Sequence, residues 1–237
     1  MKKELQLIEN DHASRMKEIL DESWKIFKWQ FANKVFVREI ENEAPFQLHF
    51  ASVIRSIGNM YVLPGETFYV DLETKWMKSE DKKKYIDITC GFYEFGDKNP
   101  KYACAIELKF KRKDYGALPH NLFAIYKDIE SLEDEIIRPE FGGDMEKPYY
   151  SEGRFYFITN NEDYCSKSAY VEKTNQDDKY QPFGLSGDKV DTHIVYHPKK
   201  GSDEDRKVDL EKDYNILWEE YKDDNEAWYF LEIDITK

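Results

Sequence analysis

The chain has 237 residues, of which 41% are hydrophobic and 16% aromatic, and its formal net charge is −13 at pH 7. This length suits one sizeable domain, and we expect residues 1–237 to form a single domain. A chain with this many aromatic residues can bury a core, which excludes global disorder. The negative charge argues against a protein that coats nucleic acid without specificity, because an acidic surface repels a polyanion.

The charge is unevenly distributed along the chain. Residues 144–237 contain 23 acidic and 13 basic residues, so the C-terminal part carries most of the negative charge. Two short segments are basic instead: residues 75–84, with five lysines against two acids, and the run KFKRK at residues 109–113. A local basic groove can bind a polyanion even on an acidic protein. The alternative interpretation is that both runs are solvated ends of a hairpin.

Membrane segments and secretion signals are not expected. No run of about 18 apolar residues occurs, which predicts no membrane span. The N-terminal sequence MKKELQLIEND lacks the apolar segment of a secretory signal. The three cysteines are scattered without metal-binding spacing, which is typical of reduced cysteines in a cytosolic protein; they are Cys90, Cys104 and Cys165.

Hydrophobic periodicity predicts helices and strands in a definite order. Apolar residues at helical spacing predict a helix at residues 12–32, and Pro45 suits the first turn of a second helix that ends at Gly58. Alternating patterns and a third helical stripe follow, with strands at 67–76, 84–95 and 101–112, a helix at 119–136 and a strand at 153–160. This order predicts an α/β or α+β domain in which helices cover a sheet.

The C-terminal part is less regular. Residues 161–191 are polar and rich in turn-forming residues, which predicts a long surface loop. Residues 192–197 predict a strand, residues 212–224 an acidic helix, and residues 227–235 a last strand. His193 and His197 lie within the first of these, where their spacing separates them by about 13 Å and disfavours a shared metal ion.

The two strands at 84–95 and 101–112 each have one apolar face and one face that carries charge. A turn near Asp97 sets Asp87 opposite Glu107, and Lys109 lies on the same face as Glu107. Opposed side chains have Cβ atoms about 5 Å apart, so two carboxylates repel each other there unless a cation lies between them. Mg²⁺ prefers oxygen ligands, and a nearby lysine offsets the negative charge that develops in phosphodiester hydrolysis. The alternative is a plain cross-strand ion pair between Asp87 and Lys109.

These residues resemble the motif of the PD-(D/E)XK nuclease superfamily, which has the restriction-endonuclease-like fold. In that motif an acid lies on one core strand, and an acid, any residue and a lysine lie on the next. Here Asp87 in YIDI and Glu107-Leu108-Lys109 in AIELKFK match it. The predicted order of helix, three antiparallel strands, helix and strand also resembles the family's core. The resemblance covers residues 40–165, after an added N-terminal helix, and leaves residues 166–237 as a C-terminal extension.

The resemblance implies a nuclease that uses Mg²⁺ or Mn²⁺, with DNA the favoured substrate and a restriction or defence system the expected setting. It implies that Asp87 and Glu107 bind the metal, that the Leu108 carbonyl adds a ligand, and that Lys109 positions or activates the attacking water.

The sequence departs from the family's pattern at two places. The family often supplies another acid from its first core helix, where Gln47 stands here; Glu43 is the nearest substitute and Glu41 a second one. The family's proline before the first acid is replaced by Ile86. Glu73, two residues after Asp71 in the strand at 67–76, is interpreted as part of a solvent-facing strand edge.

Further contacts and partners follow from the same resemblance. Within the basic runs, we expect five residues to contact nucleic acid: Lys82, Lys83, Lys111, Arg112 and Lys113. The helix at 119–136 offers three residues that could face the site: Tyr126, Lys127 and Asp128. The resemblance is also compatible with a homodimer. The alternative function is a protein of the same fold with a silent site, which binds a basic protein partner through its acidic C-terminal part.

Overall fold

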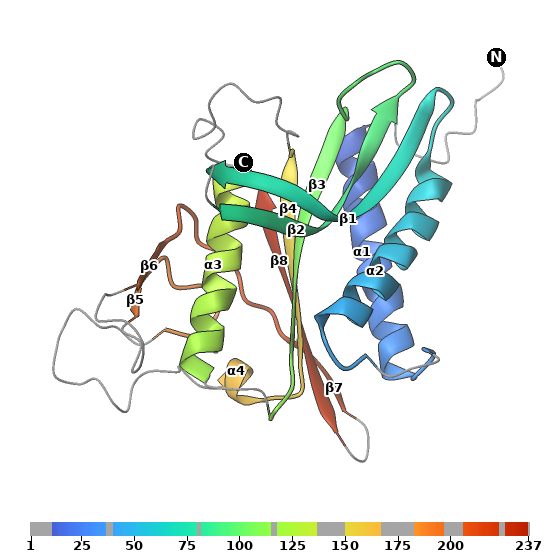
Figure 1. Ribbon diagram of the computed structural model, residues 1–237. Coiled ribbons are helices and arrows are strands. Elements are labelled where there is room, and N and C mark those ends of the chain that lie inside the picture. The colour runs from blue at the N-terminus through green and yellow to red at the C-terminus, as the bar shows by residue number, and fades with distance from the viewer. Residues whose placement is uncertain are drawn as a thin grey trace, which may run out of the picture. The chain divides into compact units, whose positions relative to one another are not determined.

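The chain forms helices and strands in separate runs, and the protein belongs to the α+β class. A computed structural model describes residues 11–36, 40–79, 82–114, 118–136, 150–166, 183–196, 206–222 and 226–236, with the backbone alone at 76–79 and 82–84 (Figure 1). The elements are α1 (His12–Ala32), α2 (Glu43–Gly58), the 3₁₀ helix η1 (Asn59–Tyr61), β1 (Glu66–Ser79), β2 (Lys82–Glu94), β3 (Tyr102–Lys111), α3 (Leu118–Ile136), β4 (Glu152–Thr159), α4 (Asp163–Ser166), β5 (His193–Tyr196), β6 (Arg206–Asp209), β7 (Glu219–Lys222) and β8 (Ala227–Thr236). Among these described helices, none is both long and apolar enough to cross a membrane.

The chain divides into two compact units. The first comprises Met1–Ile106 and Gly142–Glu152, and the second comprises Glu107–Phe141 and Gly153–Lys237. Strand β3 runs through the division, so its first residues belong to the first unit and its last residues to the second.

The two long helices of the first unit begin at capping residues. The Asp11 side chain accepts a hydrogen bond from the Ser14 backbone N–H at 2.8 Å, which satisfies an N–H that has no partner within α1. The Asn42 side chain does the same for the Ala44 N–H at 3.1 Å. Helix α2 therefore begins at Glu43, and the predicted start near Pro45 is confirmed to within two residues.

Aromatic side chains join these two helices. The ring centroid of Trp24 on α1 lies 5.4 Å from that of Phe50 on α2, and Phe27 lies 5.1 Å from Phe46. All four side chains are buried. Such rings bury a large apolar area each, so this cluster contributes to the packing of α1 against α2.

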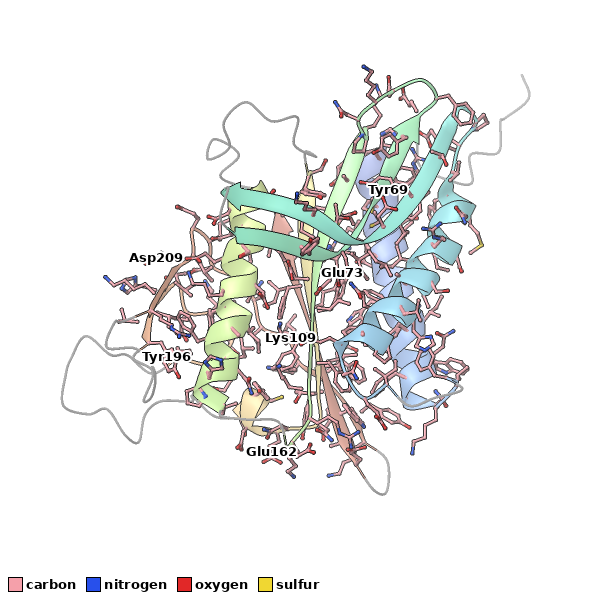
Figure 2. All side chains as sticks on the ribbon, in the orientation of Figure 1. Tyr69, Glu73, Lys109, Glu162, Tyr196 and Asp209 are labelled. Carbon is pink, nitrogen blue, oxygen red and sulfur yellow. The ribbon has the colours of Figure 1, made fainter. Side chains whose placement is uncertain are left out.

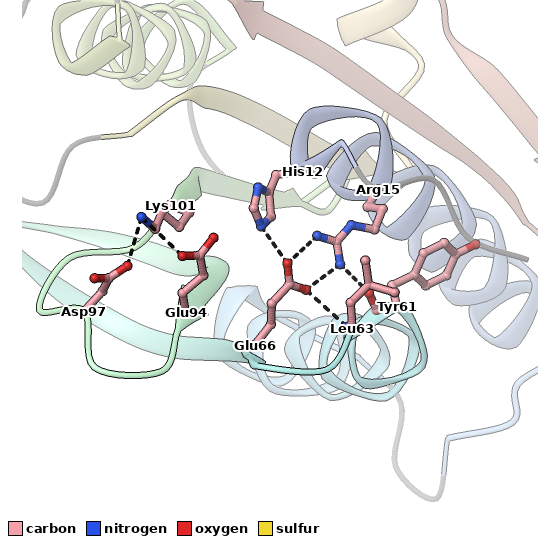
Figure 3. Close-up of polar contacts among 8 residues, drawn as sticks. All are labelled: His12, Arg15, Tyr61, Leu63, Glu66, Glu94, Asp97 and Lys101. Carbon is pink, nitrogen blue, oxygen red and sulfur yellow. Dashed lines mark hydrogen bonds and ion pairs between the residues drawn. The ribbon is translucent and has the colours of Figure 1, made fainter. Parts of the chain in front are cut away.

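A buried ion pair ties α1 to the start of β1 (Figure 3). The guanidinium of Arg15, which is fully buried, donates to both carboxylate oxygens of Glu66, at 2.6 and 2.8 Å. The Leu63 backbone N–H and the His12 imidazole also contact this carboxylate, at 3.1 and 2.9 Å. The Arg15 hydrogen bonds are the main cause that lowers the pKa of Glu66 from 4.5 to about 2.

Strands β1, β2 and the first part of β3 form consecutive antiparallel hairpins in the first unit. Between β2 and β3 the pairs run from Ile88–Ile106 to Phe92–Tyr102. This is the register that the predicted turn near Asp97 sets, so the predicted hairpin and its register are confirmed over these pairs.

The approach of β2 to β3 is close at one glycine. A Cβ atom on Gly91 would lie 2.3 Å from the Tyr102 carbonyl oxygen, which is closer than real Cβ atoms come. Ala103, the residue paired with Gly91, is itself small and fully buried. The sequence therefore needs glycine at this position because the neighbouring backbone occupies the space of a side chain.

The second unit is built from α3 and the strands that follow it. Hydrogen-bonded neighbours run in the order β3-β4-β8-β7, while β5 and β6 form a separate two-stranded sheet. The predicted apolar stripe of α3 is confirmed at Ile125, Ile129 and Leu132, which are buried. Strand β4 is buried along its whole length, and its Arg154 pairs with Glu232 of β8 at 3.0 Å.

The prediction of an acidic helix at 212–224 is wrong. This segment is irregular up to residue 218 and then forms β7, which pairs with β8 in antiparallel fashion, while residues 223 and 224 lie outside the described residues. Its burial alternates with a period of two, because Tyr214 and Ile216 are buried while Asn215 and Leu217 are exposed. This period matches a strand and excludes a helical stripe.

The prediction of a surface loop at 161–191 is wrong in part. Residues 163–166 form α4, and Phe183 and Leu185 are buried. The Tyr126 hydroxyl of α3 donates to the Gly184 carbonyl at 2.7 Å and accepts from the Asp191 N–H at 3.2 Å. Phe183, Leu185 and Val190 thus contribute to the core of the second unit, whereas residues 187–189 are exposed as a surface loop would be. Residues 167–182 lie outside the described residues.

Candidate active site

Asp87 lies on β2 between two buried isoleucines, in the first unit. Ile86 and Ile88 are 2% and 0% exposed, whereas Asp87 is half-buried. The Asp87 carbonyl oxygen accepts a hydrogen bond from Gln47 Nε2 at 2.7 Å. Helix α2 therefore contacts β2 at the residue that the motif assigns to the metal.

Glu107 and Lys109 lie on the part of β3 that belongs to the second unit. Glu107 is only 6% exposed and Leu108 is buried. Lys109, whose side chain is labelled in Figure 2, is half-buried. The predicted charge-bearing face of this strand is thus covered rather than open to solvent. Glu107 directly follows Ile106, the last residue observed to pair with β2. The pairing of Glu107 with Asp87 would be the next one after the observed pair Ile88–Ile106, and it stays a prediction.

Lys109 forms an ion pair with helix α3. Its Nζ lies 2.8 Å from Asp128 Oδ2, and the two side chains are 15% and 19% exposed. Of the three helix residues that were candidates to face the site, Asp128 thus contacts a motif residue. Tyr126 is buried against the 183–191 segment instead, and Lys127 pairs with Glu130 at 2.5 Å.

Gln47 connects two acidic residues of neighbouring strands. Besides its hydrogen bond to Asp87, its Nε2 donates to Glu73 Oε1 at 2.9 Å. Glu73 lies on β1 between the pairs Leu72–Ile88 and Thr74–Ile86, which is the position across from Asp87 in that register (Figure 2). Gln47 thus holds the side chain of one strand and the main chain of the next.

The backbone of Glu73 is strained. Its φ angle is 51°, in the left-handed region that non-glycine residues rarely adopt, and it lies within a strand. Such a conformation costs about 1–3 kcal/mol and persists only where the surrounding structure imposes it. The strand's alternation is interrupted here, since Asp71, Leu72 and Glu73 are all exposed.

Sequence reasoning missed the hydrogen bonds that Gln47 forms with Glu73 and with the main chain of Asp87. The interpretation of Glu73 as part of a solvent-facing edge agrees with its exposure, but not with its bond to α2. The one available signal was the polar Gln47 at the helix position where an acid was sought.

The acids proposed as substitutes for a helix acid lie near the start of α2. Glu43 is the first residue of the helix and is half-buried, and Glu41 is exposed before it. Gln47 lies one helical turn after Glu43 and is the α2 residue seen to contact the main chain of Asp87.

The structure describes some of the residues that are expected to contact nucleic acid. Lys111, the last residue of β3, and Arg112 after it are half-buried, and Lys113 is exposed. The side chains of Lys82 and Lys83 lie outside the described residues, although their backbones belong to β2.

The donor atoms of the motif fit a hard divalent cation. Asp87 and Glu107 offer carboxylate oxygens and Leu108 a backbone carbonyl, which are ligands of Mg²⁺. Within the part of the chain that the structure describes, no three histidine, cysteine or acidic side chains are grouped so as to hold a metal ion. Mg²⁺ usually keeps several water ligands and binds through one or two carboxylates, so the donor set is compatible with this cation.

The histidine pair offers no better metal site. His193 contacts Asp209 through its Nδ1, and both side chains are largely exposed. His197 lies outside the described residues.

Comparisons with known proteins add no assignment, since no protein-family model, no curated protein and no solved structure matches the chain.

Proposed function

We propose that the protein is a metal-dependent nuclease of the restriction-endonuclease-like fold that hydrolyses phosphodiester bonds of nucleic acid, with DNA as the substrate. The observation that carries the proposal is the order α2-β1-β2-β3-α3-β4 together with the observed β2–β3 register. In that order, Asp87 lies on the second strand and Glu107-Leu108-Lys109 on the third. An acid followed by E-x-K on the next strand is the arrangement that the resemblance requires.

In the proposed site, the carboxylates of Asp87 and Glu107 and the carbonyl of Leu108 would hold Mg²⁺ or Mn²⁺. When bound, such an ion polarises the scissile phosphate and lowers the pKa of a water ligand. The water oxygen would bond to phosphorus as the bond to the leaving ester oxygen breaks. The water would lose a proton to solvent, and the leaving oxygen would take up a proton from solvent.

Lys109 orients the attacking water and offsets negative charge on the phosphate. Its ion pair with Asp128 supports this role, because the partner on α3 restrains an otherwise flexible side chain. The basic residues at and directly after the end of β3, Lys111, Arg112 and Lys113, are proposed to contact the phosphate backbone.

The test is cleavage of supercoiled plasmid, single-stranded DNA and RNA by the purified chain with Mg²⁺ and with Mn²⁺. We expect metal-dependent cleavage of DNA, and a loss of at least a hundredfold in Asp87→Asn, Glu107→Gln and Lys109→Met. The control is Glu220→Gln, which removes an exposed carboxylate on β7 and is expected to keep full activity.

Thermal unfolding separates a metal site from a silent one. A ligand that binds the folded state alone raises the melting temperature, so Mn²⁺ should stabilise the wild type and not Glu107→Ala. No cleavage together with no metal-dependent stabilisation would reject the nuclease. The alternative, a protein-binding module that uses the acidic C-terminal part, would then be tested by its binding to a basic protein.

A further inference from the structure

We infer that Gln47 and Glu73 act as positioning residues for Asp87: Gln47 donates to the main chain at Asp87, and Glu73 fixes the orientation of the Gln47 amide. The inference rests on the proposed function, in which Asp87 is a metal ligand. All three residues belong to the first unit. They come from three elements, α2, β1 and β2, that the sequence separates by 26 and 40 residues.

The chemistry of the contacts determines the amide orientation. A carboxylate and a backbone carbonyl only accept hydrogen bonds, so the atom that faces both must be the Gln47 nitrogen. It lies 2.9 Å from Glu73 Oε1 and 2.7 Å from the Asp87 carbonyl oxygen. Both N–H bonds of the amide are therefore used, and rotation of the amide by 180° would place its oxygen against two acceptors.

The strained backbone of Glu73 supports a role beyond stability. With φ at 51°, a glycine would fit the position with less strain than glutamate does. Stability alone thus does not account for a glutamate here, whereas a carboxylate that orients Gln47 does. Residues with a strained backbone conformation are concentrated at functional sites.

The same contacts determine what the α2 position requires. An acid at residue 47 would place a third acceptor against the Glu73 carboxylate and the Asp87 carbonyl. Gln47 is therefore needed as a hydrogen-bond donor, and it is not a weakened version of a metal-binding acid. Replacement by glutamate should impair the site rather than improve it.

The test compares Gln47→Glu, Glu73→Gln and the double variant that exchanges the two side chains. Each variant is measured for cleavage rate as a function of Mg²⁺ concentration and for melting temperature. We expect Gln47→Glu to lower the maximal rate at least tenfold and to raise the Mg²⁺ concentration at half-maximal rate at least threefold. Ser52→Glu, which adds the same charge on the exposed face of α2, should change neither.

The double variant distinguishes positioning from a purely structural contact. Exchange restores a bond between an amide and a carboxylate, so the melting temperature should return toward that of the wild type. The Asp87 carbonyl still lacks its donor from α2, so the Mg²⁺ requirement should stay raised at least threefold. Recovery of both properties together would overturn the inference.

Glu73→Gly gives an independent reading. It relieves the backbone strain while removing the carboxylate, so we expect an unchanged or higher melting temperature with a rate lowered at least threefold. A wild-type Mg²⁺ dependence in both Gln47→Glu and Glu73→Gly would overturn the inference and leave the nuclease standing. An inactive wild type would overturn the proposed function and this inference together.

Discussion

At the scale of single residues, Glu66 shows how one carboxylate can stabilise a unit. It accepts hydrogen bonds from Arg15, Leu63 and His12, and the Arg15 guanidinium also lies 4.4 Å from the Phe92 ring centroid. The contact joins α1 to the beginning of β1. A charged network of this kind should make the stability of the protein depend on pH.

We expect Glu66→Gln to destabilise the protein at pH 7 and progressively less at lower pH. The folded-state pKa of Glu66 is about 2, below the ordinary 4.5, so its stabilisation is complete above pH 4.5 and is lost as pH falls toward 2. The size of the shift corresponds to a stabilisation on the order of 3 kcal/mol. Urea unfolding at pH 7, 4 and 2.5 measures it.

The control for this pH dependence is Glu94→Gln. Its partner Lys101 lies 3.4 Å away and both side chains are exposed, so the pair should contribute little. An equal loss of stability for Glu66→Gln at all three pH values would contradict the assignment of the ionised carboxylate to this role.

Residues at the candidate site differ in how far the sequence predicts them. Asp87, Glu107 and Lys109 could be singled out because a short motif lies within neighbouring strands. Glu73 could not, because a positive φ angle in a strand of ordinary residues leaves no mark in the sequence. The orientation of Gln47 likewise depends on partners that are distant in sequence.

At the scale of elements, helix α3 holds an irregular C-terminal segment in place through one buried acid. The Glu133 carboxylate is fully buried and accepts from the backbone N–H groups of Glu211 and Lys212 at 2.8 and 3.0 Å. The Tyr214 hydroxyl donates to it at 2.6 Å. One buried carboxylate thus accepts from the buried Tyr214 hydroxyl and from two partly buried backbone N–H groups.

We expect Glu133→Ala to destabilise the protein by about 3 kcal/mol or more, because it removes a buried acceptor that makes three hydrogen bonds, one of them to the buried Tyr214 hydroxyl. Chemical denaturation measures the loss, and limited proteolysis should reveal earlier cleavage near residues 210–215. Glu220→Ala, which removes an exposed carboxylate of β7, should cost less than about 0.5 kcal/mol. Similar stability of the two variants would contradict the anchoring role.

Elements with strong periodicity were predicted well, and the reason is local. Helices α1, α2 and α3 and the strands near the motif have apolar residues at regular spacing, so burial and propensity agree. The 212–224 segment misled the prediction because its acidic residues resemble a solvated helix face. Its strand pairs with β8, and such a partner cannot be read from the segment itself. The burial of Phe183 and Leu185 was missed for the same reason.

At the scale of the whole molecule, the net charge is −13, so binding to nucleic acid would depend on the local basic runs and should therefore be sensitive to salt. Each neutralised phosphate contributes about 0.9 to the slope of log affinity against log salt. We expect DNA binding in Ca²⁺ to weaken steeply with KCl, and the slope to fall by roughly 2 to 3 in the variant with alanine at Lys111, Arg112 and Lys113. Fluorescence anisotropy with a labelled duplex measures both slopes.

The matched control for the salt dependence replaces Lys207 and Lys222, which are exposed on β6 and β7. Their loss should leave the slope within about 0.5 of the wild-type value. A basic run that is merely a solvated strand end would give the same slope in both variants.

The first unit contains residues that are synthesised after helix α3, and this determines when the unit can finish folding during translation. Tyr150 is buried, the Ser151 N–H donates to the Ala103 carbonyl at 2.7 Å, and Tyr102 bonds to Glu152 at 3.1 Å. The nascent chain therefore cannot complete its N-terminal unit until more than forty further residues have been translated. During that interval β3 lacks these partners, and a chaperone that shields exposed strands would act then.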